Sequence, residues 1–307
     1  MILKPGCLHE GDRIALIAPA SPFDRNLFDR GVTELRSLGF EPVFDQTIFE
    51  RDNYLAGRAT NRARAFQTAW RDPSVAGIMA VRGGYGSAHL LPLMSLEEIR
   101  HRPKVVVGSS DITSLLSFLT VQCGVVGFHG PMVSALAKGT VGYDRLTLLN
   151  QLIQPRPYGA LELPQIEVLK PGTARGPLFG GTLTQLVASL GTPFRFQPPE
   201  GHVLLLDDVG ERPYRIDRML TQLNQAGVLS RAAGVVCAEF PECDDPANGI
   251  TARSVLASML SNIDGPVLFG MPTGHTVHPM VTLPLGVEVT VDAVGRGRVI
   301  IEEAGVT

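Results

Sequence analysis

The feature that most restricts the fold of this chain is the order of its apolar segments, which alternate with segments of helical periodicity through the first half. Short apolar runs typical of buried strands cover residues 13–20 (RIALIAPA), 42–45 (PVFD), 75–84 (VAGIMAVRGG) and 104–108 (KVVVG). Helical patterns occupy residues 24–38 and 60–70, and another begins near Asp111. This alternation, with strands that are apolar on both sides, predicts a parallel sheet covered by helices on both faces.

The middle of the chain predicts a division into two domains. Residues 154–177 are rich in proline and glycine and lack periodicity, which is typical of a linker with room for one short strand. We therefore expect an α/β protein in which residues 1–153 form a Rossmann-like parallel sheet flanked by helices. Residues 178–307 are expected to form a mixed α/β, strand-rich domain, because apolar strands there surround an amphipathic helix that ends at Gly227.

Composition limits the location and the partners of the protein. A net charge of −3 without a basic stripe argues against nucleic acid or an anionic membrane surface. No apolar stretch approaches the roughly 18 residues of a membrane span, and the first apolar run, about six residues, is too short for a signal peptide. The four cysteines are scattered without metal-ligand spacing. We expect a cytoplasmic protein with free thiols and with no metal or other cofactor.

Two serines at the junction between residues 104–108 and the following helix allow two interpretations. Ser109 or Ser110 would cap the helix, and Asp111 would complement its dipole. Alternatively, a serine on a tight strand-to-helix turn would act as a nucleophile, with helix N–H groups beside it to bind an oxyanion. The G-x-S-x-G motif of α/β-hydrolases is absent, since Asp111 and Ile112 follow Ser110.

A serine nucleophile needs a base, and the chain has seven histidines. His275 and His278 lie in the loop GMPTGHTVHP, directly after an apolar strand, where functional sites concentrate. His129 ends a strand of the first domain and would line a cleft. The other four are expected at the surface: His9, His89, His101 and His202.

Acidic and glycine-rich turns supply the remaining candidates. Asp207 ends the apolar strand HVLLLD, where its carboxylate would orient a histidine, and Asp208 and Glu211 follow either as helix caps or as further acids. The turn RGGYGS lacks the spacing of a phosphate-binding loop, and Arg82 with free backbone N–H groups suits a carboxylate equally well.

Taken together, the segments resemble the LD-carboxypeptidase family of serine peptidases, which includes murein tetrapeptide carboxypeptidases and microcin-C immunity peptidases. The resemblance covers nearly the whole chain, in family order. It is carried by GDRIALIAPASP, YLAGRATNRARAFQTAWRDPSVAGIMAVRGGYGSAHLLPL, PKVVVGSSDITSLL, GFHGPM, GGTLTQLVASLGTPF, LLLDDVGERPYRIDRMLTQL and GMPTGHTVHPMVTLPLG.

The resemblance implies a catalytic triad shared between two domains. Its serine, directly before Asp-Ile-Thr, is Ser110, and its histidine, after glycine in TGH, is His275. The acid of the family is a glutamate, but this chain has Asp207 at that position. Because aspartate is one methylene shorter, a backbone adjustment or a water would have to complete its contact with His275. Glu211 is the alternative orienting acid. Thr182 replaces a common asparagine. The resemblance also implies an oxyanion hole from the N–H groups of Gly84 and Asp111, and substrate contacts by Arg82 and Tyr85.

The expected function is therefore hydrolysis of the L,D-peptide bond that releases the terminal D-alanine from cytoplasmic murein tetrapeptides during peptidoglycan recycling. The resemblance also implies that the protein is a homodimer. Two alternatives remain. One is an immunity-type peptidase that cleaves a peptidyl- or aminoacyl-nucleotide, which would favour an aromatic platform, although Trp70 lies in a helix away from the expected cleft. The other is a catalytically silent muropeptide-binding protein.

Overall fold

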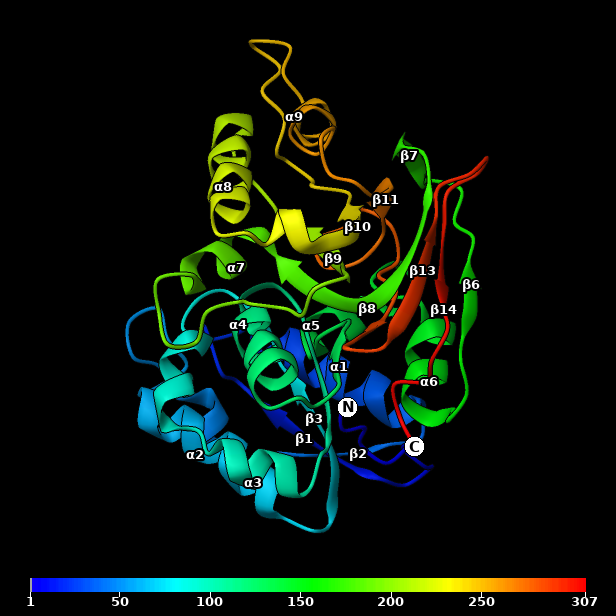
Figure 1. Cartoon of the computed structure of the whole chain (residues 1–307). Coiled ribbons are helices and arrows are strands. Elements are labelled where there is room, and N and C mark those ends of the chain that lie inside the picture. Colours follow the sequence, from blue (N-terminus) through cyan, green and yellow to red (C-terminus); the bar gives the residue numbers. More distant parts are fainter. Residues whose placement is uncertain (1) are drawn as a thin grey trace.

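The computed structural model describes residues 2–307, which form two sheets with helices around them (Figure 1). The first sheet has the strand order β12-β5-β4-β3-β1-β2. Its strands are β1 (Arg13–Ile17), β2 (Glu41–Val43), β3 (Val75–Ala80), β4 (Val105–Gly108), β5 (Gly127–His129) and β12 (Leu283–Leu285). The first five are parallel, and β12 pairs antiparallel with β5. The predicted N-terminal parallel sheet is confirmed.

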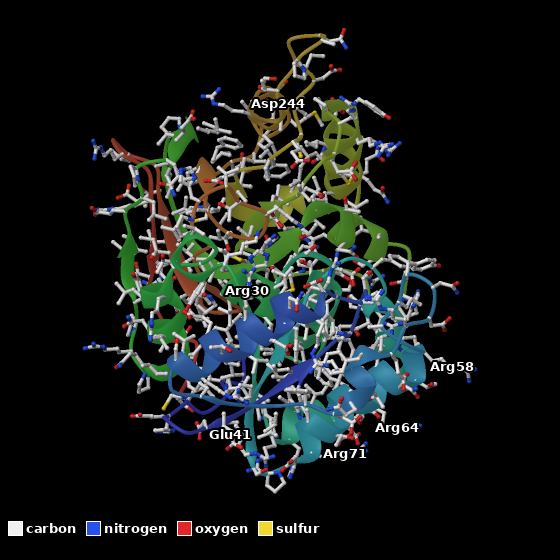
Figure 2. All side chains as sticks on the ribbon, turned by 180° about the vertical axis from the view of Figure 1, so that it is seen from behind. Arg30, Glu41, Arg58, Arg64, Arg71 and Asp244 are labelled. Atoms are coloured by element: carbon white, nitrogen blue, oxygen red, sulfur yellow. The ribbon has the colours of Figure 1, made fainter. Side chains whose placement is uncertain are left out.

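Helices cover both faces of this sheet. They are α1 (Arg25–Ser37), α2 (Ala59–Arg71), α3 (Leu96–His101), α4 (Thr113–Ser117), α5 (Val133–Leu136) and α6 (Arg145–Ile153). Since parallel crossovers are right-handed, the reversal of strand order between β1 and β3 puts α1 on one face and α2, α3 and α4 on the other. In Figure 1 α4 lies in front of the sheet, whereas α1 is in front in the reverse view of Figure 2. Such a reversal opens a crevice at the carboxyl ends of the strands.

The amphipathic pattern of α2 shows why its sequence forms a covering helix. Phe66 and Trp70, one turn apart, stack on each other and are buried against the sheet. Arg64 and Arg71 lie on the outer side, where Figure 2 shows their side chains extending outward. Trp70 therefore contributes to the core.

The second sheet has the order β6-β14-β13-β8-β9-β10-β11-β7. Its strands are β6 (Gly159–Leu161), β7 (Glu167–Lys170), β8 (Thr173–Thr182), β9 (His202–Asp207), β10 (Ala232–Ala238), β11 (Val267–Met271), β13 (Glu288–Asp292) and β14 (Arg298–Ile301), and its helices are α7 (Leu183–Ser189), α8 (Pro213–Gln225) and α9 (Ala252–Met259). Strands β8 to β11 are parallel, and the outer strands are antiparallel. Residues 154–177 thus contribute β6, β7 and the first part of β8.

Short turns of 3-10 or π geometry connect these elements. They are η1 (Gln46–Phe49), η2 (Ser87–Leu93), η3 (Ser110–Ile112), η4 (Phe118–Gln122), η5 (Gly139–Val141) and η6 (Leu229–Arg231). Across residues 2–307, no helix is both long enough and apolar enough to cross a bilayer.

The apolar run of β9 is explained by burial on both faces of the second sheet. Val203 and Leu205 belong to the large core that continues into the first sheet, while Leu204 and Leu206 pack with α7, α8 and α9. Because neighbouring side chains on a strand point to opposite faces, a strand between two cores must be apolar at every position.

Two buried histidines make the fold sensitive to acid. His202, expected at the surface, is fully buried at the start of β9 with Nδ1–H donating to the carbonyl of Pro199 (2.8 Å), and His129 is buried at the end of β5. Burial lowers the pKa of each to about 4, from 6.5. Each therefore stabilises the fold fully above pH 6.5, and this stability is lost as the pH falls toward 4, because only the unfolded chain gains the proton.

We expect His202→Asn, which keeps a donor for Pro199, to reduce this acid sensitivity. At pH 5 the protonation of an unfolded histidine costs the folded state about 2 kcal/mol. The difference in free energy of unfolding between the parent and the variant should therefore shift by about that amount, in favour of the variant, between pH 7.5 and pH 5. Urea denaturation at both pH values measures it, with exposed His101→Asn as the control. An equal pH dependence in parent and variant would contradict it.

Candidate active site

Ser110 lies on a strained turn between β4 and α4. Its φ is +59°, in the left-handed region that residues with a Cβ rarely adopt. Among the described residues no side chain caps the helical turns at this junction, so the capping interpretation of the serines is wrong. The Asp111 carboxylate instead accepts a hydrogen bond from the N–H of Ser87 (2.8 Å), which links the turn at Ser110 to the glycine-rich turn after β3.

Three side chains from distant parts of the chain form one hydrogen-bonded series. The Ser110 hydroxyl lies 3.0 Å from His275 Nε2, and His275 Nδ1 lies 2.9 Å from Asp207 Oδ2. Since a carboxylate only accepts, Nδ1 carries the proton and Nε2 is free to accept from the serine. Asp207 Oδ1 also accepts from the backbone N–H of His275 (2.8 Å).

The shorter acid reaches the histidine directly because the backbone comes close to it. A Cβ added to Gly274, whose φ is +68°, would lie 2.3 Å from Asp207 Cγ. Only glycine permits this approach. The contact needs no bridging water.

Thr182, at the end of β8, supports the same carboxylate. Its hydroxyl donates to Asp207 Oδ2 (2.9 Å), and its backbone N–H donates to Thr113 Oγ1 on α4 (3.0 Å). The sequence marked Thr182 as a departure from the family pattern but gave no sign of this contact. The adjacent ends of β8 and β9 explain it, because Thr182 and Asp207 are register partners.

Electrostatics favour a basic imidazole at this position. Burial lowers the pKa of His275, but the hydrogen bond and the charge of Asp207, together with the charge of Asp208, outweigh it and raise the pKa above 6.5. A fully buried carboxylate beside the imidazole would stabilise the positive charge of a protonated His275.

The serine and the histidine open into a cavity of about 380 Å³, lined also by Val81, Gly83, Gly84 and Met132. A Cβ on Gly83 would lie 2.9 Å from Ser110 Oγ and 3.2 Å from the backbone nitrogen of Asp111. This small space is therefore within about 3 Å of both the Ser110 hydroxyl and a backbone donor, which is where a carbonyl group attacked by that hydroxyl would have to sit.

Two cations line the cavity. Arg82 was a sequence candidate, whereas Lys138, after α5, was missed because it follows no recognisable motif. Across residues 2–307 neither has an acidic side chain at ion-pair distance. Asp24, the N-cap residue of α1, also lines the cavity, so its lining holds two cations and one carboxylate.

Other candidates lie elsewhere. The Tyr85 N–H donates to Ser21 Oγ (3.1 Å), and its exposed ring contacts that of Tyr54 (5.8 Å between centroids). Glu211 pairs with Arg215 (3.5 Å). The acid that contacts His275 is Asp207, not Glu211. His129 Nδ1 lies 3.0 Å from Thr273 Oγ1, two residues before His275.

A larger cavity, of about 750 Å³, lies beside β1, β2 and α2 and is lined by residues such as Arg13, Phe44 and Arg64. It holds none of the three hydrogen-bonded side chains. The smaller cavity is therefore the candidate active site.

The strain at Ser110 gives a stability prediction. Alanine keeps the cost of a left-handed backbone, whereas glycine adopts φ of +59° freely. We expect Ser110→Gly to be more stable than Ser110→Ala by about 1 kcal/mol. Urea denaturation of the two variants checks this, and an alanine variant of equal or greater stability would show that the turn is unstrained.

Comparison with known proteins gives consistent matches over the chain. Residues 14–130 match the LD-carboxypeptidase N-terminal domain, and residues 175–291 match the LD-carboxypeptidase C-terminal domain. A probable murein peptide carboxypeptidase of Bacillus subtilis is 33% identical, with 99% of this chain and 95% of the relative covered.

Solved structures agree with the fold. A muramoyltetrapeptide carboxypeptidase from Oxalobacter formigenes has a TM-score of 0.83 at 29% identity, with 95% of this chain and 99% of that chain covered. The microcin C7 self-immunity protein MccF has a TM-score of 0.91 at 24% identity, with 99% and 100% covered, a likeness of fold alone.

Proposed function

Because the chain belongs to the LD-carboxypeptidase family, we propose that it is a serine-type LD-carboxypeptidase that removes the terminal D-alanine from murein tetrapeptides. The observation that carries this proposal is the hydrogen-bonded series from Ser110 through His275 to Asp207, open to a cavity at Ser110. Such a series is what a serine needs to become a nucleophile.

The reaction follows from the geometry. His275 Nε2 takes the proton of Ser110 as Oγ attacks the carbonyl carbon of the L,D-peptide bond, and the oxygen gains negative charge beside the N–H groups of Gly84 and Asp111. The imidazolium then gives its proton to the leaving nitrogen, and D-alanine departs. Water, deprotonated by His275, cleaves the acyl-enzyme and restores Ser110. Asp207 stays ionised and stabilises the imidazolium in both halves.

The charges in the cavity suit a substrate that ends in a carboxylate. Arg82 and Lys138 provide fixed positive charge for the terminal carboxylate of the tetrapeptide, and Met132 and Val81 provide an apolar wall for a small side chain. Arg82 and Tyr85 are retained as substrate contacts, with Tyr85 reaching only parts of the substrate outside the cavity.

The cellular setting is part of the same proposal. Four cysteines are free thiols among the described residues, which is compatible with a reducing cytoplasm where murein peptides are recycled. A homodimer is expected from the family resemblance. Cell fractionation and light scattering on the purified protein test these two points.

The deciding experiment measures free D-alanine from L-Ala-γ-D-Glu-meso-diaminopimelate-D-Ala, with Ser110→Ala as the matched control. We expect release by the parent protein and none by the variant. Release that persists in Ser110→Ala would exclude serine catalysis.

The same preparation tests the alternatives. Faster turnover of an aminoacyl sulfamoyl-adenylate would favour the immunity-type activity, for which the exposed rings of Tyr54 and Tyr85 and the ring of Phe23 in the cavity lining offer aromatic surface. Binding of the tetrapeptide without turnover would favour a silent binding protein.

A further inference from the structure

A second carboxylate holds the loop that carries His275. Glu239 directly follows β10, and its side chain is nearly buried. One of its oxygens, Oε2, accepts from the Thr276 hydroxyl (2.5 Å) and from the backbone N–H of Val277 (2.7 Å). The other, Oε1, pairs with Nδ1 of His278. Three consecutive residues after His275 are thus bound to one side chain.

The loop has little apolar burial to fix it at this point. Val277 is 75% exposed, and the His278 side chain is 49% exposed. A loop tip that faces water depends on polar contacts for its position. Glu239 supplies such contacts to Thr276, Val277 and His278.

The sheet places the two carboxylates side by side. β9 and β10 are parallel neighbours in which Leu206 is paired with Cys237, so Asp207 and Glu239 stand at adjacent strand ends. Asp207 binds His275, and Glu239 binds the residues that follow it. Residues 275–278 of the loop are thus bound by two carboxylates, one at His275 and one at the three residues after it.

We propose that Glu239 is a positioning residue that fixes His275 Nε2 toward Ser110, an inference that rests on the proposed function. Glu239 is outside the cavity lining, so it acts on the rate of the chemical step and leaves substrate binding unchanged. A displaced base lowers the rate steeply, since a shift of about 1 Å costs on the order of 100-fold.

Two substitutions separate this role from general stability. Glu239→Ala removes all three contacts, and we expect kcat for the tetrapeptide to fall by about 10- to 50-fold with KM within about twofold. Glu239→Gln keeps an oxygen for Thr276 and Val277, and its amide donates to His278 in the other tautomer, so we expect kcat within about threefold of the parent. The exposed Glu200→Ala is the control and should leave kcat unchanged.

Each result decides the proposal. Parent-like kcat in Glu239→Ala, or a change in KM alone, would overturn it. Should Glu239→Ala not fold, Thr276→Val removes one of the three Glu239 contacts, together with the contacts of the same hydroxyl to the backbone of His278. A kcat about three- to fivefold lower at constant KM supports the role, while an unchanged kcat overturns it.

A spectroscopic readout keeps this test independent of the proposed function. The Nδ1 proton shared by His275 and Asp207 should give a low-field NMR signal in the parent and in Glu239→Gln, and a broadened or lost signal in Glu239→Ala. If the parent does not release D-alanine, the function fails, and the signal alone decides the role of Glu239: loss supports it and retention overturns it.

Discussion

Asp207→Asn should lower kcat/KM by about 10³- to 10⁴-fold without unfolding the protein. Every contact of the Asp207 carboxylate is with a donor: the ring and backbone N–H groups of His275 and the hydroxyl of Thr182. An asparagine must turn its NH₂ group toward one of them, which favours the tautomer of His275 whose Nε2 carries the proton and cannot accept from Ser110.

Steady-state kinetics with the tetrapeptide measure the loss, and circular dichroism confirms the fold. Asp217→Asn, an exposed position on α8, is the matched control and should keep full activity. An Asp207→Asn variant within tenfold of the parent would mean that the acid does not orient the base.

The pH profile of the same variant has an expected sign. Only neutral His275 accepts the serine proton, so the acid limb of kcat/KM follows the pKa of His275, which Asp207 raises above 6.5. Without that charge the effect of burial dominates and lowers the pKa. The residual activity of Asp207→Asn should therefore have its acid limb at lower pH than the parent, and a limb that stays or rises would contradict the assignment.

Gly83→Ala should lower kcat/KM by about 10²- to 10³-fold. The added Cβ would lie 2.7 Å from Ser110 Cβ and 2.9 Å from its Oγ, in the space that a substrate carbonyl would need. The backbone of Gly83 is not left-handed, so alanine is tolerated there conformationally.

Kinetics on Gly83→Ala and Gly191→Ala give the comparison. Gly191 has nothing within 4 Å of an added Cβ, and its variant should keep parent activity. Equal activity of the two variants would show that the reacting group binds elsewhere.

The first sheet could be predicted because its strands are apolar on both faces and glycine or polar turns separate them. Residues 154–177 were predicted as a linker, although they contain β6, β7 and the start of β8. An edge strand such as β6, which is exposed on one side, has fewer apolar residues than the buried strand β9. Proline and glycine then dominate the local pattern, and only long-range pairing, such as that of β6 with β14, defines the strands.

Part of the candidate site could be proposed from the sequence. Motif resemblance identified Ser110, His275 and Asp207, since each stands in a recognisable segment, and the structure brings them within hydrogen-bond distance. Thr182 contacts Asp207, which lies 25 positions further along the chain, and Glu239 contacts residues 37 to 39 positions further along. No local sequence pattern predicts such distant contacts. Lys138 reaches the cavity only because α5 packs beside α1.

The strand β12 has a mechanical consequence. The segment with His275 leaves β11 in one sheet and enters β12 in the other, where three residue pairs join it to β5. The segment that carries His275 therefore also connects the two sheets. A wide separation of the two halves would break the pairing of β12 with β5, and the N-terminal half alone would lack this edge strand, whereas the second sheet draws all its strands from residues 159–301.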